Sequence, residues 1–128
     1  MRQLSEEESG IASRFLFLSM AIIVLHQDGS YMRKSPIKIK EPYIELIEKM
    51  TAIAVNERRR LRQKMHELNM QVMKLNQNDS FTSYLFICQG REEKCNYFNP
   101  IIRKKVMNIL YELMQRAQQP SPSSAANI

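Results

Sequence analysis

The stretch that decides the predicted fold is Ser83-Tyr-Leu-Phe-Ile-Cys-Gln-Gly90, which is rich in apolar and aromatic residues. We expect a strand at Phe81–Cys88, a turn at residues 89–94 and a returning strand at residues 95–98. Asn99-Pro100 then predicts the start of a helix at residues 101–118, because Asn is a strong N-cap and Pro suits the first helical turn. The buried stripe of this helix would be Ile102, Val106, Ile109 and Leu113.

The same order of signals occurs earlier in the chain. Residues 21–27 favour a strand, and Asp28-Gly29 between apolar or aromatic flanks is the strongest short signal for a type I′ hairpin turn. Residues 30–33 would pair back against this strand, and the alternation of Ile and Lys at residues 37–40 is typical of a protected sheet edge. Pro42 would open the next helix.

The segment around residues 15–26 also fits a helix. Apolar residues recur there at spacings of three and four, which is the period of one helical face. We favour the strand because the β-branched run Ile22-Ile23-Val24 is compact and Asp28-Gly29 follows it. The residues of the alternative helical stripe are Ile11, Phe15, Leu18, Ile22 and Leu25.

The helix after Pro42 looks unusually long, from residue 43 to about residue 76. Its apolar positions alternate spacings of three and four, as in a coiled-coil seam that is weak in the middle and regular from Leu61 onward. A small domain cannot bury the apolar face of so long a helix along its whole length. The helix therefore either breaks near residues 56–60 or packs on another chain. We favour a continuous helix and a homodimer. The predicted self-association residues are Leu61, Met65, Leu68, Val72 and Leu75.

The predicted fold is therefore α+β, with one antiparallel sheet of two hairpins, each followed by a helix (ββα-ββα), and with a long first helix. Residues 1–19 would be a polar and apolar lead that the fold does not need. Residues 20–118 would form a single domain, and residues 119–128, rich in Pro and Ser, a disordered tail.

Composition and charge narrow the class of protein. The 128 residues are 44% apolar and 25% charged, which is ordinary for one soluble domain. The net charge is +6, and residues 30–75 hold this surplus with eleven basic and five acidic side chains. Such a field favours polyanions or an acidic protein partner.

Several features indicate a cytoplasmic location. Glutamates at residues 6–8 take the place of the positive region of a signal peptide, and the apolar run at residues 15–25 is too short to span a bilayer. We therefore expect no membrane association. Cys88 and Cys95 form no disulfide framework, so both thiols should be free, and they would lie opposite each other if the second turn centres on residues 91–92.

The densest charge run is the candidate binding site. It comprises Arg58, Arg59, Arg60, Arg62 and Lys64. Consecutive helical residues point in different directions, so these side chains would surround most of the helix. They would either be solvated or contact the phosphates or carboxylates of a partner. Further cations lie near the two predicted helix starts and would merge into one patch if both helices begin on the same side of the sheet. They are Arg33, Lys34, Lys38, Lys40, Arg103, Lys104 and Lys105.

No pattern of catalytic residues stands out. The two histidines, His26 and His66, show no metal-ligand spacing, and no glycine-rich phosphate loop is present. We therefore expect a non-enzymatic regulatory or adaptor protein without cofactor or metal. It would bind an acidic protein partner through its basic helix, as a dimer. The alternative is a DNA- or RNA-binding regulator that uses the charge run for phosphate contacts.

Overall fold

The computed structural model describes residues 4–120 as three helices and one antiparallel sheet. The α+β class is confirmed, but the predicted ββα-ββα order is wrong, because two helices precede all three strands. The elements, in chain order, are α1 (Glu6–Lys34), α2 (Glu41–Glu67), β1 (Met70–Gln77), β2 (Phe81–Cys88), β3 (Arg91–Phe98) and α3 (Asn99–Gln118).

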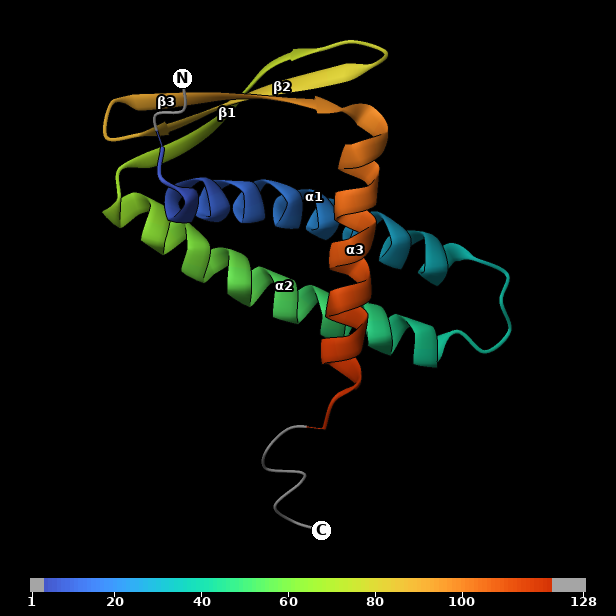
Figure 1. Cartoon of the computed structure of the whole chain (residues 1–128). Helices are drawn as coiled ribbons and strands as arrows, with labels where there is room; N and C mark the ends of the chain where they lie inside the picture. Colours follow the sequence, from blue (N-terminus) through green and yellow to red (C-terminus); the bar gives the residue numbers. More distant parts are fainter. Residues whose placement is uncertain (1–3, 121–128) are drawn as a thin grey trace.

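The elements form a helical layer and a sheet layer (Figure 1). Helices α1 and α2 make a helical hairpin, and the sheet, with strand order β1-β2-β3, lies over the end where α1 starts and α2 stops. Helix α3 leaves the end of β3 and crosses the hairpin. The loop at residues 35–40 lies at the opposite end of the hairpin from the α2–β1 junction.

Helix α1 replaces the predicted first hairpin. Its start is a capping box, in which Ser5 Oγ accepts from Glu8 N at 3.1 Å and Glu8 Oε1 accepts from Ser5 N at 2.9 Å. The predicted strands at residues 21–27 and 30–33 are both helical. Gly29 is buried inside α1, where a Cβ atom would stand 3.4 Å from the Ile47 side chain of α2. Gly29 is thus part of the contact between α1 and α2 rather than of a turn. The predicted edge strand at residues 37–40 lies in the loop.

Helix α2 ends at Glu67, so the predicted continuous helix to residue 76 is wrong. Asn69 takes a left-handed conformation (φ 51°) and its N–H donates to His66 O at 3.1 Å, which closes the helix. Strand β1 then begins at Met70. Three of the proposed self-association residues, Leu68, Val72 and Leu75, therefore lie outside the helix.

The second predicted hairpin is present as β2 and β3. Gln89 and Gly90 both have positive φ, as a two-residue type I′ turn requires, and Cys88 pairs with Arg91. The turn therefore does not centre on residues 91–92, and Cys88 and Cys95 are not opposite each other. Tyr84 faces Cys95 instead, and neither cysteine is in a disulfide.

The predicted last helix is also present, although its N-cap is Phe98 rather than Asn99. The Asn99 side chain instead accepts from Thr82 Oγ1 at 2.7 Å and donates to Asn78 O at 2.9 Å, which ties the helix start to the β1–β2 turn. Of the predicted stripe, Val106, Ile109 and Leu113 are buried and Ile102 is half-buried.

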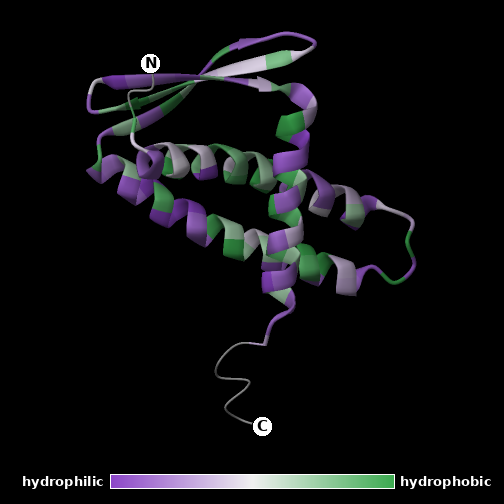
Figure 2. Ribbon diagram, in the orientation of Figure 1, coloured by the Kyte–Doolittle hydropathy of each residue, from purple (hydrophilic) through white to green (hydrophobic). Residues whose placement is uncertain are grey.

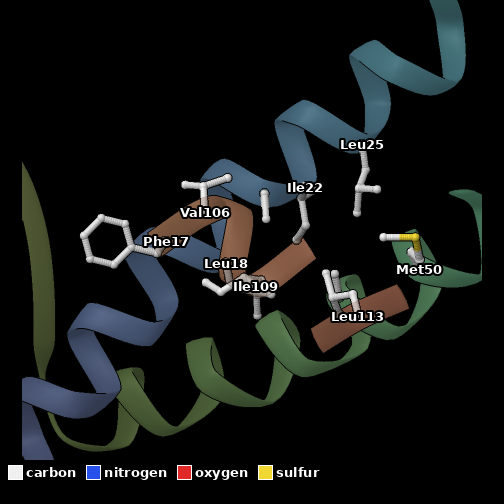
Figure 3. Packing of buried hydrophobic residues seen from close by; sticks show 10 residues of the cluster. Phe17, Leu18, Ile22, Leu25, Met50, Val106, Ile109 and Leu113 are labelled. Carbon is white, nitrogen blue, oxygen red and sulfur yellow. The ribbon is translucent and has the colours of Figure 1, made fainter. Parts of the chain in front are cut away.

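Two hydrophobic clusters hold the layers together. In the first, α3 packs on the helical hairpin (Figure 3). The labelled members are Phe17, Leu18, Ile22 and Leu25 of α1, Met50 of α2, and Val106, Ile109 and Leu113 of α3. The second cluster joins the start of α1 to the sheet through Leu4, Ile11, Ala12, Met65, Met70, Tyr84, Phe86 and Cys88.

Helix α1 is the central element of both clusters. Its sequence is apolar for most of its length, whereas α2 alternates hydrophobic and hydrophilic residues (Figure 2).

By length and composition α1 is also able to cross a membrane, but in this structure Phe17, Leu18 and Ala21 are core residues. Ile11 and Ala12, which belong to the lead predicted to be dispensable at residues 1–19, are buried. Most of the predicted tail, residues 121–128, lies outside the described residues.

Candidate functional site: a basic groove between α1 and α2

The helical hairpin carries an open groove on the side that α3 does not cover. We call it the α1–α2 groove; its two adjoining hollows share His26 and Val55, and α3 contributes to neither. On α2, Ile53 lines a different hollow together with Ala117 of α3, and Val55 lies roughly 200° further around the helix. The lining residues are Leu25, His26, Gly29, Arg33, Ile47, Glu48, Thr51, Ala52 and Val55 in one hollow, and Ser19, Ile22, Ile23, His26, Val55, Arg58, Arg59 and Arg62 in the other.

One regular stripe from each helix builds the groove. On α1, residues 19, 22, 26, 29 and 33 recur at spacings of three and four, and on α2 residues 48, 51, 55, 58 and 62 do the same. These spacings place each set on one face of its helix. Two neighbouring helices that each present such a face leave a furrow with a mixed lining.

The floor of the groove is apolar. Ile22 and Leu25 are buried core residues, and Ile47 and Val55 are half-buried. Gly29 has no side chain, which deepens one end of the furrow. On the rim, Ile23 is 57% exposed although it belongs to the most apolar helix. An apolar floor with an exposed apolar rim residue is typical of a surface that receives another apolar side chain.

The charges of the lining are mostly positive: four arginines against one glutamate. Arg33 pairs with that glutamate, Glu48, at 3.2 Å, and both side chains are more than half exposed. Arg58 is held in place, since its Nε donates to Ser19 Oγ at 2.8 Å and its guanidinium lies 4.6 Å from the centre of the Phe15 ring. Arg59 and Arg62 are exposed.

The structure therefore divides the predicted charge run. Arg58, Arg59 and Arg62 line the groove, whereas Arg60 and Lys64 do not, and Lys64 lies 3.7 Å from Glu7. The other predicted cations do not form one patch. Arg33, Lys34, Lys38 and Lys40 lie at the loop end of the hairpin, whereas Arg103, Lys104 and Lys105 lie on the first turns of α3 beside the sheet (Figure 1).

Prediction from the charge run missed the rest of the groove. The sequence prediction places Ser19 in the lead and Ile23 and His26 in a strand, whereas their spacing of four and three residues fits one face of a helix. The proposed self-association residues have other surroundings. Met65 is buried, Leu61, Leu68 and Val72 pack on the second cluster, and Leu75 is 40% exposed.

A half-buried ion-pair cluster lies on the α3 side of the hairpin. Glu57 accepts from Arg14 Nε at 2.6 Å and from Arg116 Nη1 at 2.8 Å, and Arg14 also pairs with Glu112. The Arg14 hydrogen bonds lower the pKa of Glu57 to about 2. Each arginine of this cluster pairs with a glutamate, and these ion pairs join the three helices. The cluster therefore offers no free acid or base.

A second polar cluster surrounds Cys88. Glu8 accepts from Arg91 Nη1 at 2.9 Å and Nη2 at 2.7 Å, and the Cys88 thiol lies 3.4 Å from Glu8 Oε2. Burial raises the pKa of the Cys88 thiol, which makes it a poor nucleophile at neutral pH. Within residues 4–120, no three His, Cys, Asp or Glu side chains lie close enough to hold a metal ion.

Comparison with known proteins establishes the family. The model of the family described as YhjD protein matches residues 3–118. The YhjD protein of Bacillus subtilis (strain 168) is 34% identical over 110 residues, which cover 86% of this chain and 92% of that protein. No solved structure matches. The chain therefore belongs to the YhjD family.

Proposed function

We propose that this protein is a non-enzymatic adaptor or regulator that binds an acidic, amphipathic helix of a partner protein in the α1–α2 groove. The apolar side of the partner helix would lie on Ile22, Val55 and Ile47, and its carboxylates would pair with the arginines of the rim. This is the helix-in-groove mode of recognition, in which apolar anchors recur at helical spacing.

One observation carries the proposal: α3 covers one side of the hairpin, while the opposite furrow is open, apolar at its floor and basic at its rim. Charge complementarity then selects an acidic occupant over a basic one. Arg58 is already ordered against Phe15 and Ser19, so its guanidinium loses little further freedom on binding.

A nucleic acid is the other occupant that a basic surface attracts. The groove favours a protein because its floor is apolar and because Arg60 and Lys64 do not line it, so the cations of the charge run are not gathered on one surface. Nucleic-acid binding would weaken steeply with salt, in proportion to the phosphates neutralised.

The test compares two charge-reversed variants with equal changes in net charge. R59E/R62E reverses two exposed arginines of the groove, and R60E/K104E reverses two exposed cations outside it. Both should fold, because exposed substitutions of this kind cost little stability. Each full-length variant is used as bait in a native-host extract, with and without nuclease treatment, and the partner that wild type retains after nuclease treatment is then purified and titrated.

We expect R59E/R62E to weaken binding of the purified partner by about 100-fold, at roughly 1.4 kcal/mol for each lost charge contact, and R60E/K104E to bind like wild type. Equal losses in both variants would indicate general charge attraction and would contradict the proposal. Loss of all capture on nuclease treatment would favour the nucleic-acid function instead.

Homodimer formation stays a prediction. The predicted helical seam cannot pack against a second copy, because Met65 is buried within the chain and β1 begins at Met70. Light scattering of the full chain at high micromolar concentration measures the mass directly, and a monomeric value would remove the dimer from the proposed function.

A further inference from the structure

The loop end of the helical hairpin concentrates exposed apolar residues. We call residues 31–43 the hairpin tip; it comprises the end of α1, the loop and the start of α2. Tyr31 is 80% exposed and Ile39 is 67% exposed, the two highest values among the large hydrophobic residues of the described chain. Tyr43 and Ile37 are exposed as well, on the other side of the loop and at its start.

The hairpin tip is also strongly basic. It contains four basic residues, at positions 33, 34, 38 and 40, and one acidic residue, Glu41. Lys34 and Lys38 are exposed. In Figure 2, hydrophobic residues alternate with hydrophilic ones along this loop. The apolar and cationic side chains are therefore interleaved on one small surface.

The loop has a defined shape. Lys40 Nζ donates to the carbonyl oxygens of Arg33 and Ser35, and so closes the end of α1, while Ser35 Oγ donates to Met32 O at 2.7 Å. Pro36 and Pro42 restrict the backbone on both sides of Ile37 and Ile39. The two isoleucines are thus presented on an ordered turn, at the end of the molecule away from the α2–β1 junction (Figure 1).

We propose that the hairpin tip docks on a membrane surface that contains anionic phospholipid. Ile37 and Ile39 would enter the acyl boundary, Tyr31 and Tyr43 would lie at headgroup level, and Lys34 and Lys38 would approach the phosphates. Each residue type matches the depth at which it is favoured in a bilayer interface.

A bilayer suits this surface better than a protein does. A projecting turn with only two aliphatic side chains offers little area for a protein interface, which buries about 800 Å² on each partner. The same turn enters a soft lipid surface without a complementary hollow. The inference departs from the expectation of no membrane association and does not rest on the α1–α2 groove.

The test is co-sedimentation of the full-length chain with lipid vesicles. Vesicles of phosphatidylcholine alone are compared with vesicles of equimolar phosphatidylcholine and phosphatidylglycerol. The variant I37S/I39S removes the inserting side chains, and K34Q/K38Q removes two cations. The control R60Q/K104Q has the same change in net charge outside the hairpin tip. Circular dichroism and thermal melting check that every variant is folded.

We expect wild type and R60Q/K104Q to pellet with the anionic vesicles and not with phosphatidylcholine alone. K34Q/K38Q should bind about 25-fold more weakly, since each lost cation near the surface contributes about a factor of five. I37S/I39S should bind about tenfold more weakly or worse, because it no longer buries apolar side chains in the acyl boundary. The proposal is overturned if wild type does not pellet, or if the control loses as much binding as K34Q/K38Q. Suppose that wild type does not bind vesicles, and that a purified partner protein binds wild type but not I37S/I39S. The hairpin tip would then be a protein interface instead.

Discussion

Glu57 is the residue on which the three helices converge. It lies on α2 and accepts from Arg14 of α1 and Arg116 of α3, and its side chain is only 18% exposed. The pKa of about 2 follows from these hydrogen bonds, which favour the charged carboxylate. Glu57 therefore stabilises the folded state while it is ionised, and removal of its charge leaves Glu112 as the remaining carboxylate beside Arg14 and Arg116.

The substitution Glu57→Gln should lower the free energy of unfolding at pH 7 by about 2 kcal/mol, the usual contribution of hydrogen bonds to charged groups. The stabilisation by Glu57 is complete above its unfolded pKa of 4.5 and is lost as the pH falls toward about 2. The difference between wild type and variant should therefore shrink over that window. Thermal melts between pH 7 and pH 2 measure it.

Glu48→Gln is the matched control, because Glu48 also pairs with an arginine but is 59% exposed. An exposed pair contributes about 0.5 kcal/mol or less, so this variant should melt close to wild type. A destabilisation by Glu57→Gln that stays constant from pH 7 to pH 2 would show that the carboxylate charge is not the cause.

At the scale of elements, the boundary between α2 and β1 depends on Asn69. This residue has a left-handed backbone conformation, which asparagine and glycine tolerate and β-branched residues do not. Asn69→Val should lower the free energy of unfolding by about 1–2 kcal/mol, whereas Asn69→Gly should be close to neutral. Urea unfolding of both variants provides the comparison, and equal stability of Asn69→Val and wild type would mean that the helix end is set elsewhere.

The elements that were predicted correctly are those with strong local signals. The β2–β3 hairpin and α3 follow from an aromatic strand, a glycine turn and Pro100. The first hairpin was predicted wrongly, because Asp28-Gly29 is a local turn signal that long-range packing overrides, with Gly29 buried against Ile47. Two local features favour the observed structure: the capping box at Ser5 starts α1, and the left-handed Asn69 ends α2.

The same error determined how much of the groove was predicted. The charge run identified Arg58, Arg59 and Arg62 because clustered arginines are visible in the sequence. The floor was missed because it needs α1 as a helix beside α2, and the strand interpretation placed Ile22 and Ile23 in a sheet. A groove between two helices is a property of their packing, so it follows only once both elements are right.

For the whole molecule, the N-terminal residues are expected to be essential. Four of them are buried: Phe17 and Leu18 belong to the first hydrophobic cluster, and Ile11 and Ala12 belong to the second. A chain of residues 20–128 would lose these contacts, and loss of even one large buried side chain costs about 2–5 kcal/mol, which is comparable to the total stability of a small domain. We expect this truncated chain to be insoluble or to lack a cooperative melting transition. A soluble product with a sharp thermal transition would instead support a dispensable lead.

The central claim, that a partner protein occupies the α1–α2 groove, is tested most directly by site-specific photocrosslinking in native-host cells. A photoreactive amino acid replaces either Ile23 on the groove rim or Tyr111 on α3, two apolar positions of similar exposure, at 57% and 60%. We predict that the photoreactive residue at position 23 crosslinks to one discrete protein, and that this crosslink is lost when R59E/R62E is introduced into the same chain. The photoreactive residue at position 111 should give no crosslink. Equal crosslinking from both positions, or from position 111 alone, would contradict the account.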